Sequence, residues 1–486
     1  MIHRLLTAVC ALALVLSFSF SATAAVQNVQ VGGDIEVKGI YQSAYDIVNE
    51  IEFNNVTVYD NNGFGGAADN TVHDYLEQTV RLYVDASLTD NVEAYVRLIY
   101  VQDWGMVVNQ DDVEVDLAYI TLNDIYGYPF SLTIGRQELM YGEGFLVGDG
   151  VRPGAVDSAT VYQYDTRKSF EAIKAVWDYE PHQIDLFVAK ITEGAAVAPV
   201  AAAAPVAPWS NGVQPVDSDM DLYGINWNYD GGMYGLWDLG LFYNRSNIVV
   251  ASDGENQTWA LSIRGEGTIP QIDVGTLALK GEIVKEWGIV EPGMQPVTAA
   301  TGNNERLDAW GGYVEGEYTF DNVYAPYLGL GYIFMSGDND DSDAIEQFNP
   351  LFEDETYGQI AEVIYGAQYW QMLGDTSMTN ASIWKLSAGV NPTENTTLDL
   401  TYYSLSAAQP LWSWTGDADD QNQYIGSEYD VTFNYNYSED VTFGLMYALF
   451  IPGKFFEEGA DEVAGDPWDY SFENAQELVG SVKVVF

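Results

Sequence analysis

Residues 79–100, TVRLYVDASLTDNVEAYVRLIY, carry the pattern that decides the fold. Apolar residues stand at every second position from Val80 to Leu88, and again from Val92 to Tyr100. This alternation is typical of β-strands whose two faces meet different surroundings. The Thr-Asp-Asn between the two segments has the residues of a short turn. The stretch therefore predicts two antiparallel strands joined by a tight hairpin.

The same alternation recurs along the chain, and the connectors between these segments are short and long in strict succession. Eight connectors are short and rich in turn residues: 89–91, 123–124, 180–182, 230–232, 269–270, 321–322, 392–394 and 438–440. Nine are long and are centred near 46–74, 104–112, 141–165, 193–219, 246–255, 287–305, 337–381, 407–425 and 452–474. These connectors separate about 18 strands. Short turns at one end, long loops at the other and an even strand number predict an all-β fold, a transmembrane antiparallel up-and-down β-barrel.

The N-terminus has the composition of a secretory signal peptide. His3 and Arg4 precede an apolar run that reaches Phe20, and Ala22-Thr23-Ala24 provides the small residues of a cleavage site. The only cysteine, Cys10, lies inside this segment. We expect residues 1–25 to be removed and residues 26–486 to form a single barrel domain in the bacterial outer membrane.

The last residues of the chain, AQELVGSVKVVF, alternate again and end on Phe486. This ending resembles the final strand of bacterial outer-membrane proteins, and the resemblance implies recognition by the barrel assembly machinery through Phe486. The other expected partners are outer-membrane lipid, lipopolysaccharide and a small hydrophilic or polymeric solute. The net charge of −54 argues against nucleic acid as a partner. The sequence leaves the oligomeric state open.

Basic residues are scarce and concentrate in the predicted strands, whereas acidic residues crowd the long loops. An Arg or Lys on the lipid face costs about 2–4 kcal/mol at the bilayer midplane, so most strand cations are expected to face the lumen. The predicted basic residues of the pore lining are Lys38, Arg81, Arg97, Arg136, Lys168, Lys174, Arg264, Lys280, Lys385 and Lys483. The predicted acidic ones are Asp85, Glu93, Asp116, Glu282, Asp399 and Asp430. These cations either attract anions or only pair with the acids, and both interpretations stay open.

For three strand cations, the alternation does not assign the side chain to the lumen face. Lys285 shares parity with apolar Ile283 and is expected near a membrane interface, while both faces around Lys190 are apolar. Arg136 shares parity with Ile134, so we expect either a bulge that turns it into the pore or a strand that is already leaving the bilayer.

The segment GRQELMYGEGFLVGD (135–149), followed by TRKSFEAIKAVWDYEPHQIDLFVAK (166–190), resembles the alginate export family of porins. The first motif is matched by Gly135, Arg136, Gln137, Leu139, Tyr141 and Gly142. The second is matched by Arg167, Ser169, Phe170, Glu171 and Ala172, with Lys168 inserted and Glu in place of Asp. The resemblance implies an outer-membrane barrel of eighteen strands that passes an anionic polysaccharide through a basic lumen. The excess of acid departs from that expectation.

The resulting functional hypothesis is a channel for passive diffusion or export of hydrophilic, anionic solutes or polysaccharide. The alternatives are a general or cation-tolerant porin and a non-conducting structural or adhesin barrel. An enzyme would need a catalytic constellation, but outside the signal peptide the chain has only His73 and His182 and no cysteine. We therefore expect no catalytic residue, no cofactor and no metal. The acidic run 336–346 lacks the Gly and Glu of a calcium loop and is interpreted as a solvated loop tip.

Overall fold

The computed structural model describes most of the predicted strands and parts of the loops. The described residues are 28–45, 48–53, 56–58, 72–104, 113–148, 151–152, 155–156, 162–163, 166–167, 169–192, 219–246, 256–272, 274–290, 305–339, 344–369, 378–410, 422–456 and 468–486. The predicted signal peptide, Lys168 and part of the acidic run lie outside them. Within these residues, no helix is long and apolar enough to cross a membrane.

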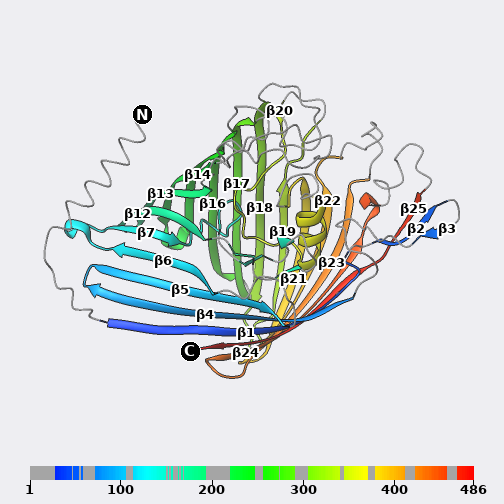
Figure 1. Cartoon of the computed structure of the whole chain (residues 1–486), viewed down its shortest axis with the longest axis horizontal. Helices are drawn as coiled ribbons and strands as arrows, with labels where there is room; N and C mark the ends of the chain where they lie inside the picture. Colours follow the sequence, from blue (N-terminus) through cyan, green and yellow to red (C-terminus); the bar gives the residue numbers. More distant parts are fainter. Residues whose placement is uncertain are drawn as a thin grey trace, which may run out of the picture.

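Eighteen long antiparallel strands form the wall of a closed barrel (Figure 1). They are β1 (Asn28–Ser43), β4 (His73–Thr89), β5 (Val92–Asp103), β6 (Glu114–Leu122), β7 (Phe130–Gln137), β12 (Phe170–Tyr179), β13 (His182–Thr192), β14 (Met220–Asp230), β15 (Leu236–Ser246), β16 (Asn256–Ile272), β17 (Gly275–Val290), β18 (Glu305–Phe320), β19 (Tyr327–Met335), β21 (Ala381–Thr393), β22 (Thr396–Ala407), β23 (Tyr424–Asn436), β24 (Val441–Pro452) and β26 (Ala475–Val485). Each pairs with the next along the chain, which confirms the predicted up-and-down order.

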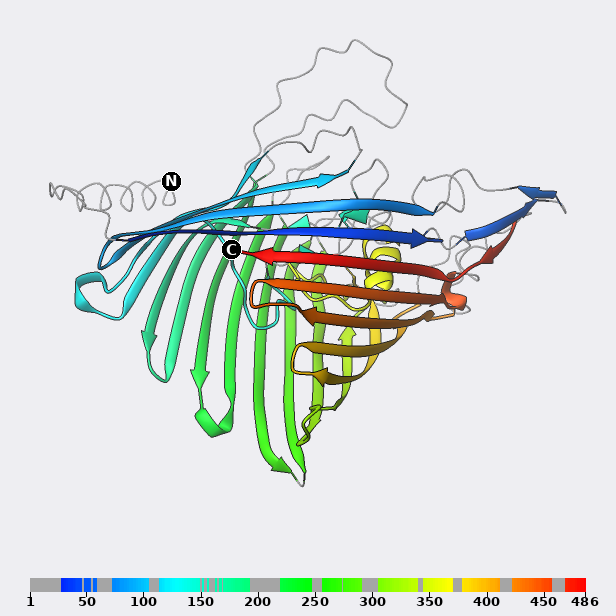
Figure 2. The same cartoon turned by 90° about the horizontal axis from the view of Figure 1, so that it is seen from below.

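The barrel closes through its first and last strands, which lie side by side in Figure 2. β1 pairs with β26 along one edge and with β4 along the other, so Asp34 stands opposite both Val485 and Arg81. The backbone of Gly33 also exchanges two hydrogen bonds with Phe486, at 2.9 and 3.0 Å. Closure leaves no sheet edge for lipid to contact.

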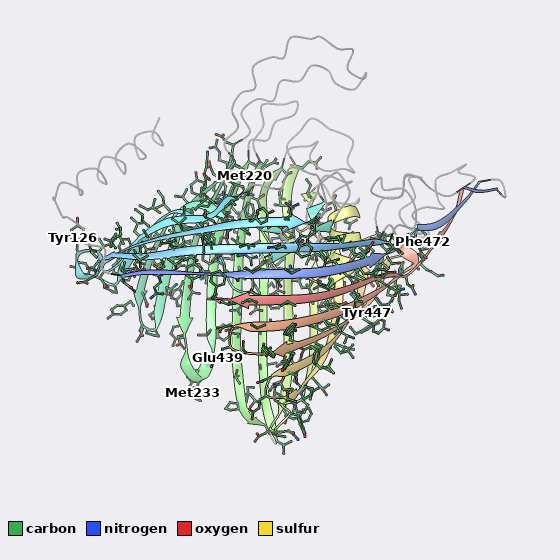
Figure 3. All side chains as sticks on the ribbon, turned by 60° about the horizontal axis from the view of Figure 1, so that its bottom comes forward. Tyr126, Met220, Met233, Glu439, Tyr447 and Phe472 are labelled. Atoms are coloured by element: carbon green, nitrogen blue, oxygen red, sulfur yellow. The ribbon has the colours of Figure 1, made fainter. Side chains whose placement is uncertain are left out.

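Short turns gather at one end of the barrel and long connections at the other. In Figure 3 the turn residues Tyr126, Met233 and Glu439 lie at the turn end, whereas Met220 and Phe472 lie at the loop end. One predicted turn was misplaced, because β16 continues through Pro270 to Ile272. The β16–β17 register is irregular between Ile269 and Ile272. Pro270 has no N–H to donate, but at this irregularity no hydrogen bond between the strands is lost.

The two faces of the wall follow the predicted alternation. On β4, Leu82 and Val84 pair with Leu98 and Val96 of β5, and three of these four side chains are about 40% exposed. The opposite face carries charged and tyrosine side chains, and buried aromatic residues toward the loop end. The exposed apolar face is the one that meets lipid, because no water is needed to satisfy its side chains.

Two long connections fold against the inner face of the barrel. One is the stretch 138–148 after β7, and the other includes β20 (Ala344–Ile345), α2 (Gln359–Ala361) and η3 (Glu362–Tyr369). The helical part of the second connection lies within the barrel outline in both views (Figures 1 and 2). We call these the first and second inserted loops. The remaining short strands pair among the loops: β2 (Val48–Phe53) with β3 (Val56–Val58) and β25 (Trp468–Phe472), β8 (Val151–Arg152) with β11 (Thr166–Arg167), and β9 (Ala155–Val156) with β10 (Tyr162–Gln163).

Candidate functional site

The family motif marks the point where the chain leaves the wall and enters the lumen. Gly135 has φ +131°, and a Cβ there would lie 2.2 Å from the carbonyl oxygen of Ala118, so only glycine fits. Gln137, which is 3% exposed, ends β7 and donates from Nε2 to the carbonyl oxygens of Thr133, Gly135 and Ala172. These bonds hold the end of the strand where the first inserted loop begins.

Leu139 and Tyr141 anchor the first inserted loop on the inner wall. Leu139 is fully buried, and the Tyr141 ring stacks on Phe187 of β13 with centroids 5.3 Å apart. The same ring lies 5.4 Å from that of Phe242 on β15. Burial of such aromatic side chains is a large stabilising term, so the loop is held along several strands of the wall.

Gly142 and Glu143 carry the loop to the charged part of the lumen. Gly142 has φ +62°, and a Cβ there would meet the Cδ of Arg264 at 2.8 Å. The next residue, Glu143, accepts hydrogen bonds from Arg264 at 3.1 Å and from Lys280 at 2.5 Å. The motif therefore places one carboxylate between two cations of the wall.

Arg264 of β16 is the centre of a network of charged side chains that begins at Glu143 and extends across the wall. Its Nη1 donates to Asp238 of β15 at 2.9 Å, and its Nη2 donates to Glu143 and Glu266. The residue is only 6% exposed. Since a guanidinium has five donors in a rigid plane, one arginine can hold several carboxylates in place.

The network continues across the next strands of the wall. Lys280 of β17 lies 3.7 Å from Glu315 of β18, and Lys385 of β21 lies 3.1 Å from the other oxygen of Glu315. Gly331 of β19 stands between Glu315 and Lys385 in the register and leaves room for this contact. We call Asp238, Arg264, Glu143, Lys280, Glu315 and Lys385 the charge ladder.

The charge ladder borders a cavity of about 640 Å³. Its lining includes Lys280, Glu315 and Lys385 together with polar side chains of Thr268 and Ser387. A second cavity of about 540 Å³ is lined by Gly142, Asp238 and Arg264 together with turn-end residues such as His182 and Asn228. The alternating charges therefore face space that a hydrated solute can occupy.

Predicted lumen cations on the rest of the wall are paired in the same manner. The contacts are Lys38 Nζ with Glu77 at 3.4 Å, Arg81 with Asp34 at 3.0 Å, Arg97 with Asp116 at 2.5 Å and with Glu138, and Lys174 with Asp185 at 3.1 Å. Lys483 stands opposite Glu36 in the β1–β26 register. All these residues lie on the lumen face, and their role in permeation stays a prediction.

The predicted lumen acids also lie on the inner face. Glu282 accepts a hydrogen bond from Ser262 at 2.6 Å, and Asp399 accepts one from the Tyr327 hydroxyl at 2.7 Å. Asp85 and Glu93 share the face of Tyr95, and Asp430 is 8% exposed beside Glu428. Among the described residues, no group of three or more His, Cys, Asp or Glu is arranged to hold a metal ion.

Arg136 does not line the pore. It stands opposite Ala118 and Glu171, on the face that Ile134 shares with Ile173, and the register has no bulge there. Of the two alternatives expected for Arg136, the bulge is wrong and the strand that is already ending is confirmed: β7 ends one residue later, at Gln137, so Arg136 is at the loop end of the wall. Glu138 pairs with Arg97, and Arg136 lies 4.0 Å from Glu171 on the neighbouring strand.

Lys190 and Lys285 lie on the same outer face as Arg136. Lys190 pairs with Asp221 at 3.0 Å and is opposite Glu171 in the register. Lys285 lies over the Trp310 ring, 4.4 Å from its centroid, and pairs with Asp308. The prediction from alternation that Lys285 lies on the face of Ile283 is confirmed. Lys190, whose face the sequence left open, lies on the outer face.

The second inserted loop packs against the first and against the opposite part of the wall. Phe348 stacks on Phe145 with centroids 5.5 Å apart and contacts the position of Gly311 on β18. At the start of α2, the backbone N–H groups of Ile360 and Ala361 donate to Glu428 of β23 at 2.8 and 2.7 Å. The two loops together narrow the lumen at the loop end of the barrel.

The lumen environment changes the acidity of two loop carboxyls in opposite directions. Burial alone would raise the pKa of Glu143, but hydrogen bonds and charge from Lys280 and Arg264 outweigh it and lower that pKa. Burial raises the pKa of Glu355 to about 7, although Lys280 and Lys385 act against the shift. Glu143 is therefore ionised at neutral pH, while Glu355 titrates there.

Sequence reasoning missed all three acids of the charge ladder: Asp238, which pairs with Arg264, and Glu143 and Glu315, which join its cations. Glu143 stands in Gly-Glu-Gly directly after the family motif, and this isolated acid between two glycines is the only local signal. Glu315 alternates with apolar Val314 as any lumen residue would. Their pairing depends on a loop that enters the lumen, which alternation does not reveal.

Comparisons with known proteins agree with this architecture. A family model described as alginate export matches residues 51–468. No curated protein matches the chain in sequence. Among solved structures, the outer membrane protein OprD from Pseudomonas aeruginosa is 10% identical, with a TM-score of 0.51, over 96% of this chain and 97% of that one. A double variant of OccD1 (OprD) is 10% identical, with a TM-score of 0.50, over 95% and 97%. At this identity the likeness shows the barrel fold alone.

Proposed function

The chain belongs to the alginate export family of outer-membrane channels, and we propose that the solutes it passes are hydrophilic and anionic, either small acids or acidic polysaccharide. The family match and the closed eighteen-strand barrel place the protein in the bacterial outer membrane, in contact with lipid and lipopolysaccharide. Passage takes place by diffusion or export and involves no catalytic step. Folding through the assembly machinery, with Phe486 as its signal, is part of the proposal.

The charge ladder is the observation that supports an anionic solute. Arg264 and Lys280 are joined by Glu143, and this carboxylate belongs to a loop and not to the wall. A carboxylate of a passing sugar acid has the same charge and geometry as the Glu143 side chain. Exchange of one carboxylate for the other leaves both cations paired, so a solute acid can bind here without leaving a buried charge unpaired.

The alternating signs also suit a chain of acidic sugars. Lys280, Glu315 and Lys385 follow one another across the wall, so cations that accept a carboxylate alternate with acids that accept hydroxyl hydrogen bonds. Paired charges bind a solute weakly, and several weak sites one after another along the pore allow a solute both to enter and to leave.

A second candidate function is a weakly selective, cation-tolerant porin. The chain carries 72 acidic and 18 basic residues, and each charge-ladder cation contacts at least one carboxylate. An acidic lumen and acidic loops concentrate cations. A non-conducting structural barrel is the third outcome that an experiment must separate.

Conductance in planar bilayers distinguishes these functions. The refolded protein is expected to conduct ions, and a KCl gradient gives its anion-to-cation permeability ratio from the reversal potential. An oligouronate of about four residues is expected to block the current at lower concentration than a neutral oligosaccharide of equal length. Equal block by both oligomers would favour the weakly selective porin, and no conductance would favour the structural barrel.

Matched variants connect this result to the charge ladder. Lys280→Gln is expected to raise the blocking concentration of the oligouronate about fivefold, since one charge contact is lost. Lys454→Gln, which removes a cation from the exposed segment after β24, is expected to leave it unchanged. Hydrolysis of the oligomer that is lost on mutation of His73 would contradict the proposal and indicate an enzyme.

A further inference from the structure

Among the residues that the structure describes, five basic side chains lie on the outer face of the barrel wall, and all five lie toward the loop end. They are Arg136, Lys190, Arg245, Lys285 and Arg306, on strands β7, β13, β15, β17 and β18. Four of the five stand within two residues of the loop end of their strands, and Lys285 stands five residues from it. We call this set the basic belt. The belt lies where the outer leaflet of the membrane meets water.

The basic belt occupies one sector of the barrel only. From β19 through β26 and β1 to β5, the described loop-end residues of the outer face are chiefly uncharged, such as Tyr402, Ser427, Gln476 and Tyr41. Asp74 is the charged wall residue among those described in that sector, and it is acidic; Lys454 lies beyond the end of β24. General solubility at the rim would not confine cations to one sector, so the asymmetry points to a ligand on that side.

A row of stacked aromatic rings lies directly on the membrane side of four of the five belt residues. Tyr223, Tyr243, Trp259 and Trp287 occupy the same register row on β14 to β17. Their successive ring centroids are 5.9, 4.4 and 6.5 Å apart. Tyrosine and tryptophan at such a position mark the boundary between hydrocarbon and headgroups. Lys190, Arg245 and Arg306 stand two residues further toward the loops than this row, and Arg136 stands in line with Lys190, so these four are at the level of the lipid headgroups. Lys285 stands two residues on the membrane side of Trp287.

Acids within the belt orient its cations and leave donors for a ligand. Arg306 is 71% exposed in its side chain and contacts Asp308 through Nη2 at 3.1 Å. Arg136, 40% exposed, lies 4.0 Å from Glu171. Each guanidinium has five N–H donors, so one contact with a carboxylate leaves donors that match the oxygens of a phosphate.

We propose that the basic belt is a binding site for a phosphorylated glycolipid of the outer leaflet. The belt cations bind the phosphate groups of its sugar headgroup, and the aromatic row contacts the start of its acyl chains. Charge complementarity favours this ligand over a zwitterionic phospholipid, because only an anionic headgroup gains from several cations in one sector of the wall. The site faces lipid and is separate from the lumen.

The test compares lipid A with two phosphates, lipid A from which both phosphates are removed, and phosphatidylethanolamine. Binding of each to the full-length barrel in detergent is measured by native mass spectrometry. We expect the bisphosphorylated form to bind at least tenfold more tightly than the other two. Equal binding of the phosphorylated and dephosphorylated forms would overturn the proposal.

The matched variants are Arg136→Gln/Arg306→Gln in the belt and Lys454→Gln in the segment after β24, outside the belt. Each belt cation is expected to contribute about fivefold, so the double variant should lose more than tenfold in affinity for bisphosphorylated lipid A. Lys454→Gln should bind as the wild type does. Heat-modifiable gel mobility verifies that each barrel has folded, and the exposed Arg306→Gln alone serves if the double variant has not. A belt variant that folds and binds as tightly as the wild type would disprove the site.

Discussion

The lumen face and the outer face of the same strands use their few basic residues differently. Inside, cations are distributed along the wall and each charge-ladder cation contacts a carboxylate, as Lys280 does with Glu143 and Glu315. Outside, cations gather at the loop end of one sector, as Arg306 does beside Asp308. The two faces alternate residue by residue, so the difference reflects the two solvents and not the sequence neighbourhood.

The cost of an unpaired charge explains this difference. A cation in the lumen meets water and carboxylates at any depth, but a cation on the outer face is costly in hydrocarbon. Lys285, the deepest of the outer cations, is paired with Asp308 and lies over the Trp310 ring. The energetic cost of an outer cation therefore depends chiefly on its position along the strand, while the cost of an inner cation depends chiefly on its pairing with a carboxylate. Variants on one face can therefore be compared with variants on the other face, or at another depth, as controls.

The largest effect is expected from a cation in the middle of the outer face. Ile283 lies near the centre of β17 and is 52% exposed, opposite Ile263 and Gly312. Ile283→Arg should lower the free energy of unfolding in lipid vesicles by about 2–4 kcal/mol. Denaturant titration followed by tryptophan fluorescence measures this free energy of unfolding.

Ile289 of the same strand and face is the control. It stands one residue from the loop end and beside the basic belt, opposite Arg306. Ile289→Arg should cost about 0–1 kcal/mol. Equal losses for the two variants would show that depth does not govern the outer face.

A glycine on each face tests what the inserted loops contribute. A Cβ at Gly311, on the lumen face, would lie 2.6 Å from the Phe348 ring of the second inserted loop. Gly311→Ala should therefore cost about 1–3 kcal/mol through overpacking and should increase current fluctuations as the loop loosens. Gly480→Ala, on the outer face with no atom within 4 Å, should change neither the stability nor the current.

Removal of one cation from each face should separate selectivity from lipid contact. Lys280→Gln leaves the carboxylates of Glu143 and Glu315 with one fewer cation, so the anion-to-cation permeability ratio should fall about two- to fivefold. Arg306→Gln, on the outer face, should leave the ratio unchanged. Reversal potentials in a KCl gradient measure both. A shift with Arg306→Gln equal to that with Lys280→Gln would mean that the faces are not independent.

Alternation alone predicted the wall because lipid and lumen impose opposite requirements on neighbouring residues. It assigned Leu82 and Arg81 to opposite faces correctly, and connector lengths gave the number of strands. Pro270 was mistaken for a turn because a proline at a register irregularity looks the same in sequence as one in a turn.

Depth and long-range pairing were the parts that the sequence did not reveal. Parity placed Arg136 on the outer face correctly, but the bilayer cost left two alternatives, a bulge or a strand that is already ending, because the end of β7 at Gln137 was unknown. Glu143 joins Arg264 and Lys280 across more than 100 residues of sequence, and that contact depends on where a loop folds. Local periodicity contains no information on such contacts.

The smallest effect is expected from the pH of the lumen. Burial raises the pKa of Glu355 to about 7, and the neighbouring acids Glu143 and Glu315 add to the shift while Lys280 and Lys385 oppose it. The raised pKa means that the folded state prefers the protonated carboxyl. Its contribution to stability is therefore complete below the ordinary pKa of 4.5 and is lost as the pH rises through about 7.

The same titration adds one negative charge to the lumen between pH 6 and pH 8. The anion-to-cation permeability ratio of the wild type should fall less than about twofold over this interval, because Lys280 and Lys385 partly compensate the new charge. Glu355→Gln should abolish the change, whereas Glu439→Gln, in the exposed turn between β23 and β24, should retain it. A pH response that persists in Glu355→Gln would place the titrating group elsewhere. Its loss would identify the second inserted loop as the part of the lumen whose charge varies near neutral pH, while the paired wall keeps its charge.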